Sequence, residues 1–325
     1  MTATGAGSPA AEPPLELVAR FKEALDRLWP EGGRLGLAVS GGPDSLAMLL
    51  LAEAAIPGQF EVATVDHGLR PESAGECAMV AEICAERGVP CQILSVEIEA
   101  GNLQSKARVA RYAALAGWAQ ERGLSAVATA HHADDQAETF LMRLNRGSGV
   151  AGLAGVRERG AVPGTDLPLI RPLLGCRRAE LDAAVQGSNL VPVSDPSNVD
   201  DRFERARLRK ALAEADWLDL AAIAAAAANF GEADEALEWA ARREWAERAH
   251  LGDSEVRYSP GAPRAVVLRV VERVIAHFGG AARGGDVARL VDGLVQARSG
   301  NLGGVLATAE GDEWVFRPEP PRRTG

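Results

Sequence analysis

Aromatic residues, cysteine and long apolar runs are all scarce in this 325-residue sequence, and each scarcity excludes a class of protein. The longest uninterrupted apolar run, residues 220–228, has nine residues, far fewer than the roughly 20 that span a bilayer. The first fifteen residues lack the basic and apolar regions of a secretion signal, so we expect a cytoplasmic protein without a membrane partner. Aromatic residues make up only 5% of the chain, so Ala, Leu and Val must fill most of its core.

The four cysteines form no Cys-x-x-Cys pair, which is the spacing that many zinc and iron–sulfur sites use. We therefore expect four buried or inert thiols. With 47% hydrophobic and 25% charged residues the chain has the composition of a globular protein. Its length predicts two domains, because a domain has roughly 150 residues.

The net charge of −10 does not by itself suggest a nucleic-acid partner, but the charge is unevenly distributed. Residues 141–210 contain twelve Arg or Lys against eight Asp or Glu, a local charge of +4. A basic face on an acidic protein can bind a phosphate backbone. An ordinary solvated surface of mixed charge is the alternative.

The first half of the chain alternates short apolar runs with helical stretches, which is typical of βαβ units. The sequence therefore predicts a doubly wound, mainly parallel α/β sheet of the Rossmann-like kind, with ligands bound at the carboxyl ends of its strands. The expected strands are 35–39, 62–65, 92–96 and 126–130, and the expected helices are 46–55, 73–87, 103–122 and 134–145.

The second half predicts a glycine-rich connection, a largely helical region and a terminal β-hairpin around Gly311-Asp312. Its expected segments are a connection at 147–166, a helix at 178–186, a turn at 194–198, a helical region at 207–250, and helices at 265–278 and 287–298. We expect a disordered start (1–15), a first domain with a basic linker (16–215) and a smaller, mostly helical substrate domain (216–325).

The strongest local motif is Ser40-Gly41-Gly42-Pro43-Asp44-Ser45, directly between an expected strand and an expected helix. Glycines let the backbone curl around an anion, the serines add hydroxyl donors, and the helix N-terminus adds unpaired N–H groups. This pattern predicts a phosphate-binding loop that is neither a Walker A loop nor a dinucleotide fingerprint. A plain turn that caps the helix is the weaker reading.

Two further motifs follow strands, so we expect them at the same edge of the sheet. Asp66-His67 ends the second strand, and the stretch from His131 to Thr139 ends the fourth. Asp135 and Glu138 lie three residues apart and share a helix face. Together with His131 they could bind a metal, hold a cationic substrate or take up a proton, or they could be part of an ordinary capped helix start.

The Ser40–Ser45 loop resembles the pyrophosphate-binding loop of the N-type ATP pyrophosphatases. The resemblance implies an ATP substrate, a Mg²⁺ ion positioned by Asp44, and a substrate oxygen that becomes adenylated before a nucleophile displaces AMP. It also implies that the residues around ATP and pyrophosphate include Ser40, Gly41, Gly42, Pro43, Asp44, Ser45, Asp66, His67, Arg108 and Arg111.

The longer pattern His-His-x-Asp-Asp-x-x-Glu-Thr with a later Arg-Gly-Ser-Gly resembles the tRNA(Ile)-lysidine synthetases, a branch of this superfamily. The likeness extends through Arg171-Pro172-Leu173-Leu174, Asp195-Pro196-Ser197-Asn198 and Gly300-Asn301-Leu302-Gly303-Gly304, and so covers residues 30–316. This chain has Arg205-Ala206 where the family usually has Arg-Asn, and it looks like the short form with one C-terminal domain.

The resemblance implies a ligase that joins free L-lysine to the wobble cytidine of a CAU-anticodon tRNA(Ile), which then reads AUA as isoleucine. It implies catalytic roles for Asp44, His131, Asp135 and Glu138, the two helix carboxylates holding the cationic lysine. Residues expected to contact tRNA are Arg143, Arg146, Arg205, Arg207 and Arg209. A homodimer is compatible with this family.

Four other functions remain open from the sequence. Two lie within the superfamily: a tRNA thiolase, which generally needs cysteine pairs, and a small-metabolite synthetase. The third is a two-metal phosphoesterase built on Asp66-His67, His131-His132 and the acids after them. The fourth is a non-catalytic nucleotide sensor. Pyrophosphate exchange that depends on the cognate tRNA separates the ligase from all four.

Overall fold

The computed structural model describes residues 12–68, 70–97, 103–193 and 200–319. The predicted turn at 194–198 and the first eleven residues of the predicted disordered start lie outside this part of the chain. The chain divides into two compact units, Met1–Asn229 and Phe230–Gly325, and the division falls inside helix α9 (Leu220–Arg248). No helix of the described residues is long and apolar enough to cross a membrane.

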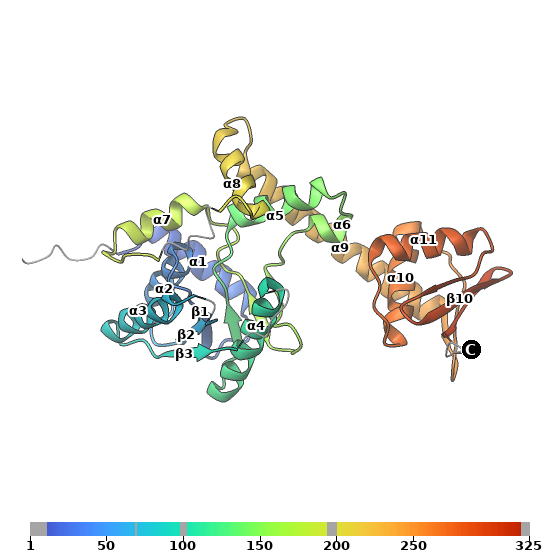
Figure 1. The fold of residues 1–325 in the computed structure, drawn as a ribbon, viewed down its shortest axis with the longest axis horizontal. Coiled ribbons are helices and arrows are strands. Elements are labelled where there is room, and N and C mark those ends of the chain that lie inside the picture. The colour runs from blue at the N-terminus through green and yellow to red at the C-terminus, as the bar shows by residue number, and fades with distance from the viewer. Residues whose placement is uncertain (1–11, 69, 98–102, 194–199, 320–325) are drawn as a thin grey trace, which may run out of the picture. The chain divides into compact units, whose positions relative to one another are not determined.

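The first unit is built on a six-stranded sheet in the order β3-β2-β1-β4-β6-β5 (Figure 1). Every neighbouring pair is parallel except β5–β6. The doubly wound, mainly parallel fold predicted from the sequence is thus confirmed. The strands are β1 (Leu35–Ala38), β2 (Phe60–Asp66), β3 (Cys91–Ser95), β4 (Ala126–Ala128), β5 (Arg159–Ala161) and β6 (Pro168–Ile170).

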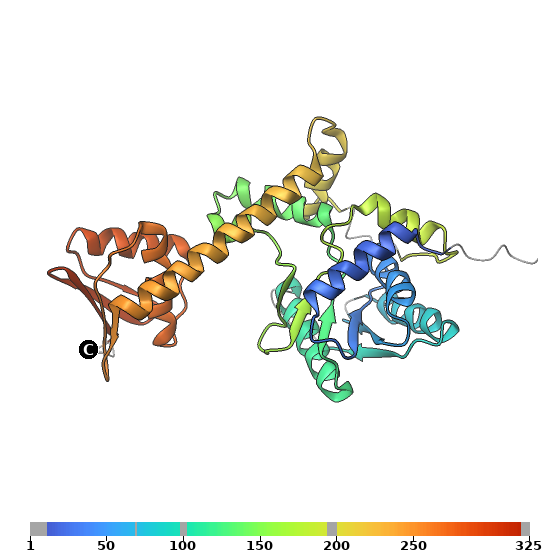
Figure 2. The same ribbon diagram turned by 180° about the vertical axis from the view of Figure 1, so that it is seen from behind.

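Alternation along the central strands sends side chains into two separate cores. Leu35 and Leu37 of β1 face the core that contains α1, α2 and α7, whereas Ala63 and Val127 face the core beneath α4. Figure 2 shows α1 covering its face of the sheet from behind. The helices of this unit are α1 (Leu15–Leu28), α2 (Pro43–Ala55), α3 (Glu72–Glu86), α4 (Leu103–Arg122), α5 (Ala133–Asn145), α6 (Val150–Leu153), α7 (Arg178–Gln186) and α8 (Glu204–Glu214), with the start of α9.

The strand order reverses between β1 and β4, and this reversal locates the binding crevice. The chain proceeds from β1 to β2 and β3 on one side and then returns to place β4 on the other side of β1. The loops that leave the carboxyl ends of β1 and β4 therefore diverge and open a space between them. The Ser40–Ser45 loop follows β1 and the two histidines follow β4, so both motifs border this crevice.

The second unit has an antiparallel five-stranded sheet in the order β7-β8-β11-β10-β9, with two packed helices. Its core is rich in valine and includes an edge-to-face contact between Tyr258 and Trp314 at 6.0 Å. The predicted hairpin is present as β10 and β11, joined at Gly311-Asp312. The elements are β7 (Ala249–Leu251), β8 (Val256–Tyr258), α10 (Arg264–His277), α11 (Gly284–Val295), β9 (Gly300–Leu302), β10 (Val305–Glu310) and β11 (Glu313–Pro318).

Two sequence expectations need correction. The helical region predicted at 207–250 is two helices, α8 and α9, because Asp219 begins a new helix by accepting the N–H of Ala221 at 2.8 Å. The connection predicted at 147–166 contains helix α6 and strand β5, whose last residue is Ala161.

Candidate active site

The loop after β1 is held in one conformation by its own hydroxyl groups. The Oγ of Ser45 accepts the N–H of Ser40 at 3.1 Å and donates to the carbonyl of Gly42 at 2.9 Å. Gly41 has a φ of +81°, and a Cβ there would lie 3.1 Å from Met79 and from Val193. Only glycine fits this position without strain.

Helix α2 starts directly at this loop and directs its first N–H groups toward the crevice. Gly42 is the N-cap residue and accepts the N–H of Leu46 at 3.0 Å, and Pro43 occupies the first helical position. No side chain of the described residues caps this end, so its backbone donors are available to an anion. The predicted phosphate-binding loop therefore has the geometry that anion binding requires.

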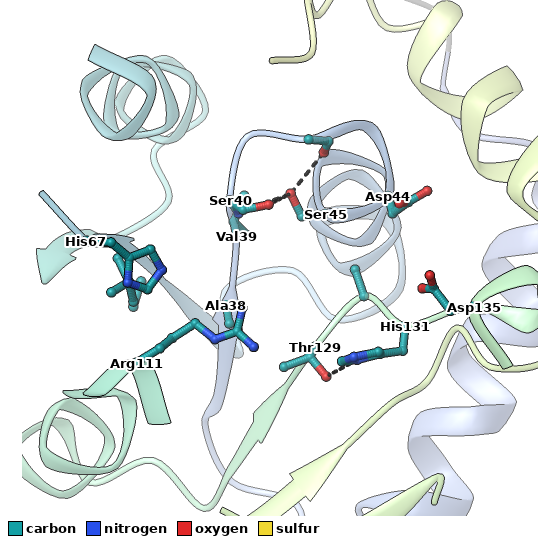
Figure 3. A pocket seen from close by; sticks show the side chains of 14 residues that line it. Ala38, Val39, Ser40, Asp44, Ser45, His67, Arg111, Thr129, His131 and Asp135 are labelled. Carbon is teal, nitrogen blue, oxygen red and sulfur yellow. Dashed lines mark hydrogen bonds between the residues drawn. The ribbon is translucent and has the colours of Figure 1, made fainter. Parts of the chain in front are cut away.

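A pocket of about 230 Å³ lies between the carboxyl ends of β1, β2 and β4 (Figure 3). Its apolar wall comes from alanines and valines in and directly after β1 and in β2. Its polar wall comes mainly from the Ser40–Ser45 loop, which we call the nucleotide loop, and from Thr129, His131 and Asp135. The lining residues are Ala38, Val39, Ser40, Gly42, Asp44, Ser45, Ala63, Val65, His67, Arg111, Thr129, Ala130, His131 and Asp135. The pocket thus contains most of the residues predicted to bind ATP. In addition to Asp44 it contains two of the other predicted catalytic residues, His131 and Asp135.

Asp44 presents one carboxylate oxygen to the protein and leaves the other without a partner. Its Oδ2 lies 3.5 Å from Nε2 of His132, while its Oδ1 is buried and has no hydrogen-bond partner among the described residues. Burial acts to raise the pKa of Asp44, but the contact with His132 and the charges of His132, Arg178 and Arg209 outweigh it and lower the pKa. Asp44 is therefore an anion at neutral pH.

His131 lines the pocket as a neutral imidazole. Its Nδ1 lies 3.0 Å from Oγ1 of Thr129. Burial lowers its pKa to about 4, and nearby arginines (Arg171, Arg111 and Arg108) add to this effect against the opposing charge of Asp135.

His132, which the sequence named in the two-metal alternative but not among the expected site residues of the ligase, is fully buried and lies outside the pocket lining. It is the N-cap of α5: Nδ1 accepts the N–H of Asp135 at 3.4 Å, and its own N–H donates to the Asp135 carboxylate at 3.4 Å. The helix start is therefore capped, as the alternative interpretation of this motif allowed, but by His132 and not by Asp134, which binds Arg177 in a bidentate pair at 3.0 Å.

Asp135 and Glu138 share a helix face but have different surroundings. Asp135 lines the pocket, and Figure 3 shows its carboxylate pointing toward the space between Asp44 and His131. Glu138 is only 3% exposed and does not line the pocket. Both of its oxygens accept from Arg209, at 2.7 and 3.0 Å, and Arg205 lies 3.3 Å away.

The two arginines predicted on α4 differ in their access to the pocket. Arg111 lines it opposite the nucleotide loop, whereas Arg108 is exposed and does not line it. Both guanidinium groups lie over the ring of Tyr112, at 5.0 and 5.1 Å. Neither has a carboxylate partner within the described residues, so Arg111 presents its charge to the pocket without an ion pair.

The two residues of the Asp66-His67 motif also differ in their access to the pocket. His67 lines the pocket, its Nδ1 is buried without a partner among the described residues, and burial together with Arg111 lowers its pKa. Asp66 accepts from Ser73 at 2.5 Å and from the N–H of Gly68 at 2.9 Å, and these bonds lower its pKa. Asp66 therefore holds the turn into α3, and only His67 reaches the pocket.

The remaining arginines predicted to contact tRNA have protein partners. Arg143 donates to the carbonyls of Gly152 and Gly155, and Arg146 pairs with Glu204. Arg207 donates to the carbonyl of Asp201 at 2.6 Å. Arg146 and Arg207 lie on the surface, whereas Arg143 is less exposed and fixes the connection after α5.

Arg171 is a further charged residue near the pocket that the sequence placed only within a family motif. It is 7% exposed, its Nη1 donates to the carbonyl of Arg157 at 2.6 Å, and its Nε has no partner among the described residues. Burial lowers its pKa. With Arg108 and Arg111 it adds positive charge near His131, which helps to lower the pKa of that imidazole against the opposing charge of Asp135.

Comparison with known proteins agrees with this fold. Residues 15–216 match the PP-loop domain family. The solved structure of the U34-tRNA thiolase NcsA from Methanococcus maripaludis, with its [4Fe-4S] cluster, has a similar fold. Its TM-score is 0.54 at 18% identity, over 68% of this chain and 80% of that one. The first unit is therefore a PP-loop domain.

Relatives that match nearly the whole chain show to which family of PP-loop proteins it belongs. The tRNA(Ile)-lysidine synthase of Novosphingobium aromaticivorans is 48% identical over 94% of this chain and 95% of its own length. That of Zymomonas mobilis is 42% identical over 93% and 94%. This chain belongs to the tRNA(Ile)-lysidine synthase family, as the resemblance of its motifs predicted.

Proposed function

We propose that this protein ligates lysine to the wobble cytidine of a CAU-anticodon tRNA(Ile), so that the tRNA reads AUA as isoleucine. The cytidine C2 oxygen attacks the α-phosphorus of ATP, and pyrophosphate leaves. The side-chain amine of lysine then attacks C2, the C2–O bond breaks, and AMP leaves with that oxygen. Adenylation thus converts a poor leaving group into a good one. Membership of the tRNA(Ile)-lysidine synthase family and the PP-loop domain support this ATP-dependent reaction.

The observation that carries the proposal is the shared pocket of the nucleotide loop and Asp135. Asp44 and Asp135 both approach Nε2 of His132, at 3.5 and 3.4 Å, so their carboxylates are near neighbours. A site with a phosphate loop on one wall and a separate carboxylate on the other can hold an adenylating nucleotide beside a cationic nucleophile. A flipped-out anticodon base would enter between them.

The loop and the α2 N-terminus are suited to hold the phosphates, and Arg111 and His67 face them from the opposite wall. Backbone N–H groups and a guanidinium bind phosphate oxygens without proton transfer. The apolar wall of β1 and β2 offers a surface for the adenine ring. Among the residues predicted for ATP, Asp66 and Arg108 would act from outside the pocket lining.

Mg²⁺ fits this site through Asp44. The unpartnered, buried Oδ1 of an ionised carboxylate is the kind of ligand that Mg²⁺ shares with substrate phosphates. Among the described residues no group of three or more His, Cys, Asp or Glu could hold a metal, so the phosphates would have to supply other ligands. When bound, the ion would neutralise phosphate charge during pyrophosphate departure.

Asp135 is the residue best placed to hold the lysine ammonium group, because its carboxylate borders the pocket. Glu138 stays a prediction for the same role, since lysine would have to displace Arg205 or Arg209 from it. Neutral His131 can accept a proton from the amine. The negative phosphates of bound ATP oppose the arginines around this imidazole and raise its pKa, which makes it a stronger base at that moment.

The tRNA contacts are proposed for the exposed arginines of both units. Arg146 and Arg207 are accessible in the first unit. Exposed arginines without a carboxylate partner among the described residues of the second unit are Arg242, Arg283 and Arg298. Such groups bind phosphate backbones and position the RNA without reading its sequence. We assign residues 216–325 to this substrate-recognition role.

The proposal is tested by incubating the protein with CAU-anticodon tRNA(Ile), MgATP and labelled lysine, followed by mass analysis of the nucleosides. We expect a cytidine whose mass has increased by lysine minus water, and no product when ATP is omitted. Asp44→Ala should abolish tRNA-dependent ATP–pyrophosphate exchange, whereas Asp135→Asn should chiefly raise the KM for lysine. Adenylation that delivers any other nucleophile to the tRNA would overturn the proposal.

A further inference from the structure

His132 lies at the point where the two halves of the pocket meet, although it does not line the pocket itself. Its ring is fully buried between the first turn of α2, which carries Asp44, and the first turn of α5, which carries Asp135. A buried polar ring costs free energy unless its nitrogens find partners. The partners of its two nitrogens therefore indicate what it does.

Three contacts of the ring agree on one tautomer. Nδ1 accepts the N–H of Asp135 at 3.4 Å, which leaves the ring proton on Nε2. Nε2 lies 3.5 Å from the carboxylate of Asp44 and 3.4 Å from that of Asp135. The Arg178 guanidinium, which can only donate, also lies 3.4 Å from Nε2, and with the ring proton on Nε2 this contact contributes charge and not a hydrogen bond. These distances are at the long end for hydrogen bonds.

This arrangement decides which carboxylate oxygens face the substrates. Because His132 occupies the Oδ2 side of Asp44, Oδ1 is the oxygen left without a partner. Without a donor between them, two neighbouring carboxylates would repel each other and turn apart. Nε2–H is the group that both carboxylates approach.

We propose that His132 is a positioning residue that orients Asp44 and Asp135 from one imidazole and so couples the nucleotide half of the pocket to the lysine half. The part of the inference that concerns Asp135 and lysine rests on the proposed function. The part that concerns Asp44 depends on nucleotide binding alone. Residues that orient a ligand from behind typically change affinity or activity by about 10- to 100-fold when removed.

Two substitutions separate this role from a purely structural one. In His132→Asn the amide oxygen takes the place of Nδ1, so the helix cap is kept, since Asn is a favourable N-cap residue, but the reach to Asp44 is lost. In His132→Gln the amide nitrogen takes the place of Nε2, so the donor to the carboxylates is kept, but the cap is lost. His132→Asn therefore removes the hydrogen-bond donor to the carboxylates, and His132→Gln removes the helix cap.

The experiment measures thermal stability, the Kd for MgATP by calorimetry, and the KM for lysine in the full chain. We expect Asn to keep the Tm better than Gln, and Gln to keep nucleotide affinity better than Asn. The Asn variant should bind MgATP about 10-fold more weakly or worse and show a raised KM for lysine. If affinity and KM follow the order of the Tm values, or if Asn binds MgATP as the wild type does, the proposal is overturned.

The outcome is distinguishable from failure of the proposed function. Wild-type protein that forms no lysidine contradicts the function, yet the MgATP affinities of the two variants still report on His132 and Asp44. Conversely, wild-type protein that forms lysidine together with variants of unchanged affinity contradicts the role of His132 alone.

Discussion

Two pairs of arginines in the first unit, one on α4 and one on α8, meet their surroundings in different ways. Arg108 and Arg111 lie over Tyr112 and have no carboxylate partner among the described residues. Arg205 and Arg209 both bind the buried Glu138 and so tie α8 to α5. A guanidinium that lacks a protein carboxylate keeps its charge for a phosphate, whereas one held by a buried glutamate stabilises the fold. Composition alone would rank the two pairs equally.

The largest expected effect is on ATP use, at Arg111 of α4, which has no carboxylate partner among the described residues. Arg111→Gln should lower kcat/KM for ATP in tRNA-dependent pyrophosphate exchange by about 100-fold, or about 3 kcal/mol, because a charged donor to phosphate is lost. Arg209→Gln is the matched variant on α8 and should change this value much less. Equal losses in the two variants would contradict the view that the α4 arginines bind phosphate whereas the α8 arginines stabilise the fold.

Burial of His131, to which the charges of nearby arginines add, also predicts an acid sensitivity. Its pKa is about 4 in the folded protein against 6.5 ordinarily, so between these values the unfolded chain binds more protons. Stability should therefore fall by about 2–3 kcal/mol as the pH drops from 6.5 to 4. Urea unfolding of wild type and His131→Asn across this range measures the contribution, which should be missing in the variant. Parallel curves for both proteins would contradict it.

The paired arginines predict a loss of stability when their partner is neutralised. Glu138→Gln should lower the free energy of unfolding by about 1–3 kcal/mol, because two half-exposed guanidinium groups lose a buried carboxylate. Chemical denaturation measures this change, and a double-mutant cycle with Arg209→Gln isolates the pair. A cycle without coupling would show that the contact does not stabilise the protein.

The smallest effect is expected at the surface. Arg146→Gln breaks an exposed pair with Glu204 and should change stability by less than about 0.5 kcal/mol. If Arg146 contacts tRNA phosphate as predicted, the slope of log affinity against log salt should become shallower by somewhat less than one unit. Filter binding at several salt concentrations tests this, and an unchanged slope would remove Arg146 from the tRNA interface.

The elements of the first unit were largely predictable, since strong apolar runs end at glycine. Helices at 103–122 and 178–186 have the bounds that the sequence predicts, and the four predicted strands agree within a few residues. Strands such as β5, β7 and β9 have only three residues each, too few for an alternation to be visible. Their existence depends on neighbours that are distant in sequence.

The site was predictable as a set of motifs but not as a set of contacts. The sequence places Asp135 and Glu138 on one helix face, but it cannot show that two arginines of α8 pair with Glu138, or that Arg209 also lies 3.9 Å from Asp135. Nor can it show which of two consecutive histidines enters the core: His132 is buried and His131 borders the pocket. Tertiary packing makes both distinctions.

The rigid loop after β1 has a consequence for the thermodynamics of nucleotide binding. Ser45 bonds the backbone at both ends of the loop, and the N–H of Val193 donates to the carbonyl of Gly41 at 2.9 Å. Its shape is thus set by the folded protein before any ligand arrives. The chain entropy lost in ordering these residues belongs to folding, so a nucleotide that docks there gains its full contact energy without having to organise the backbone that receives it.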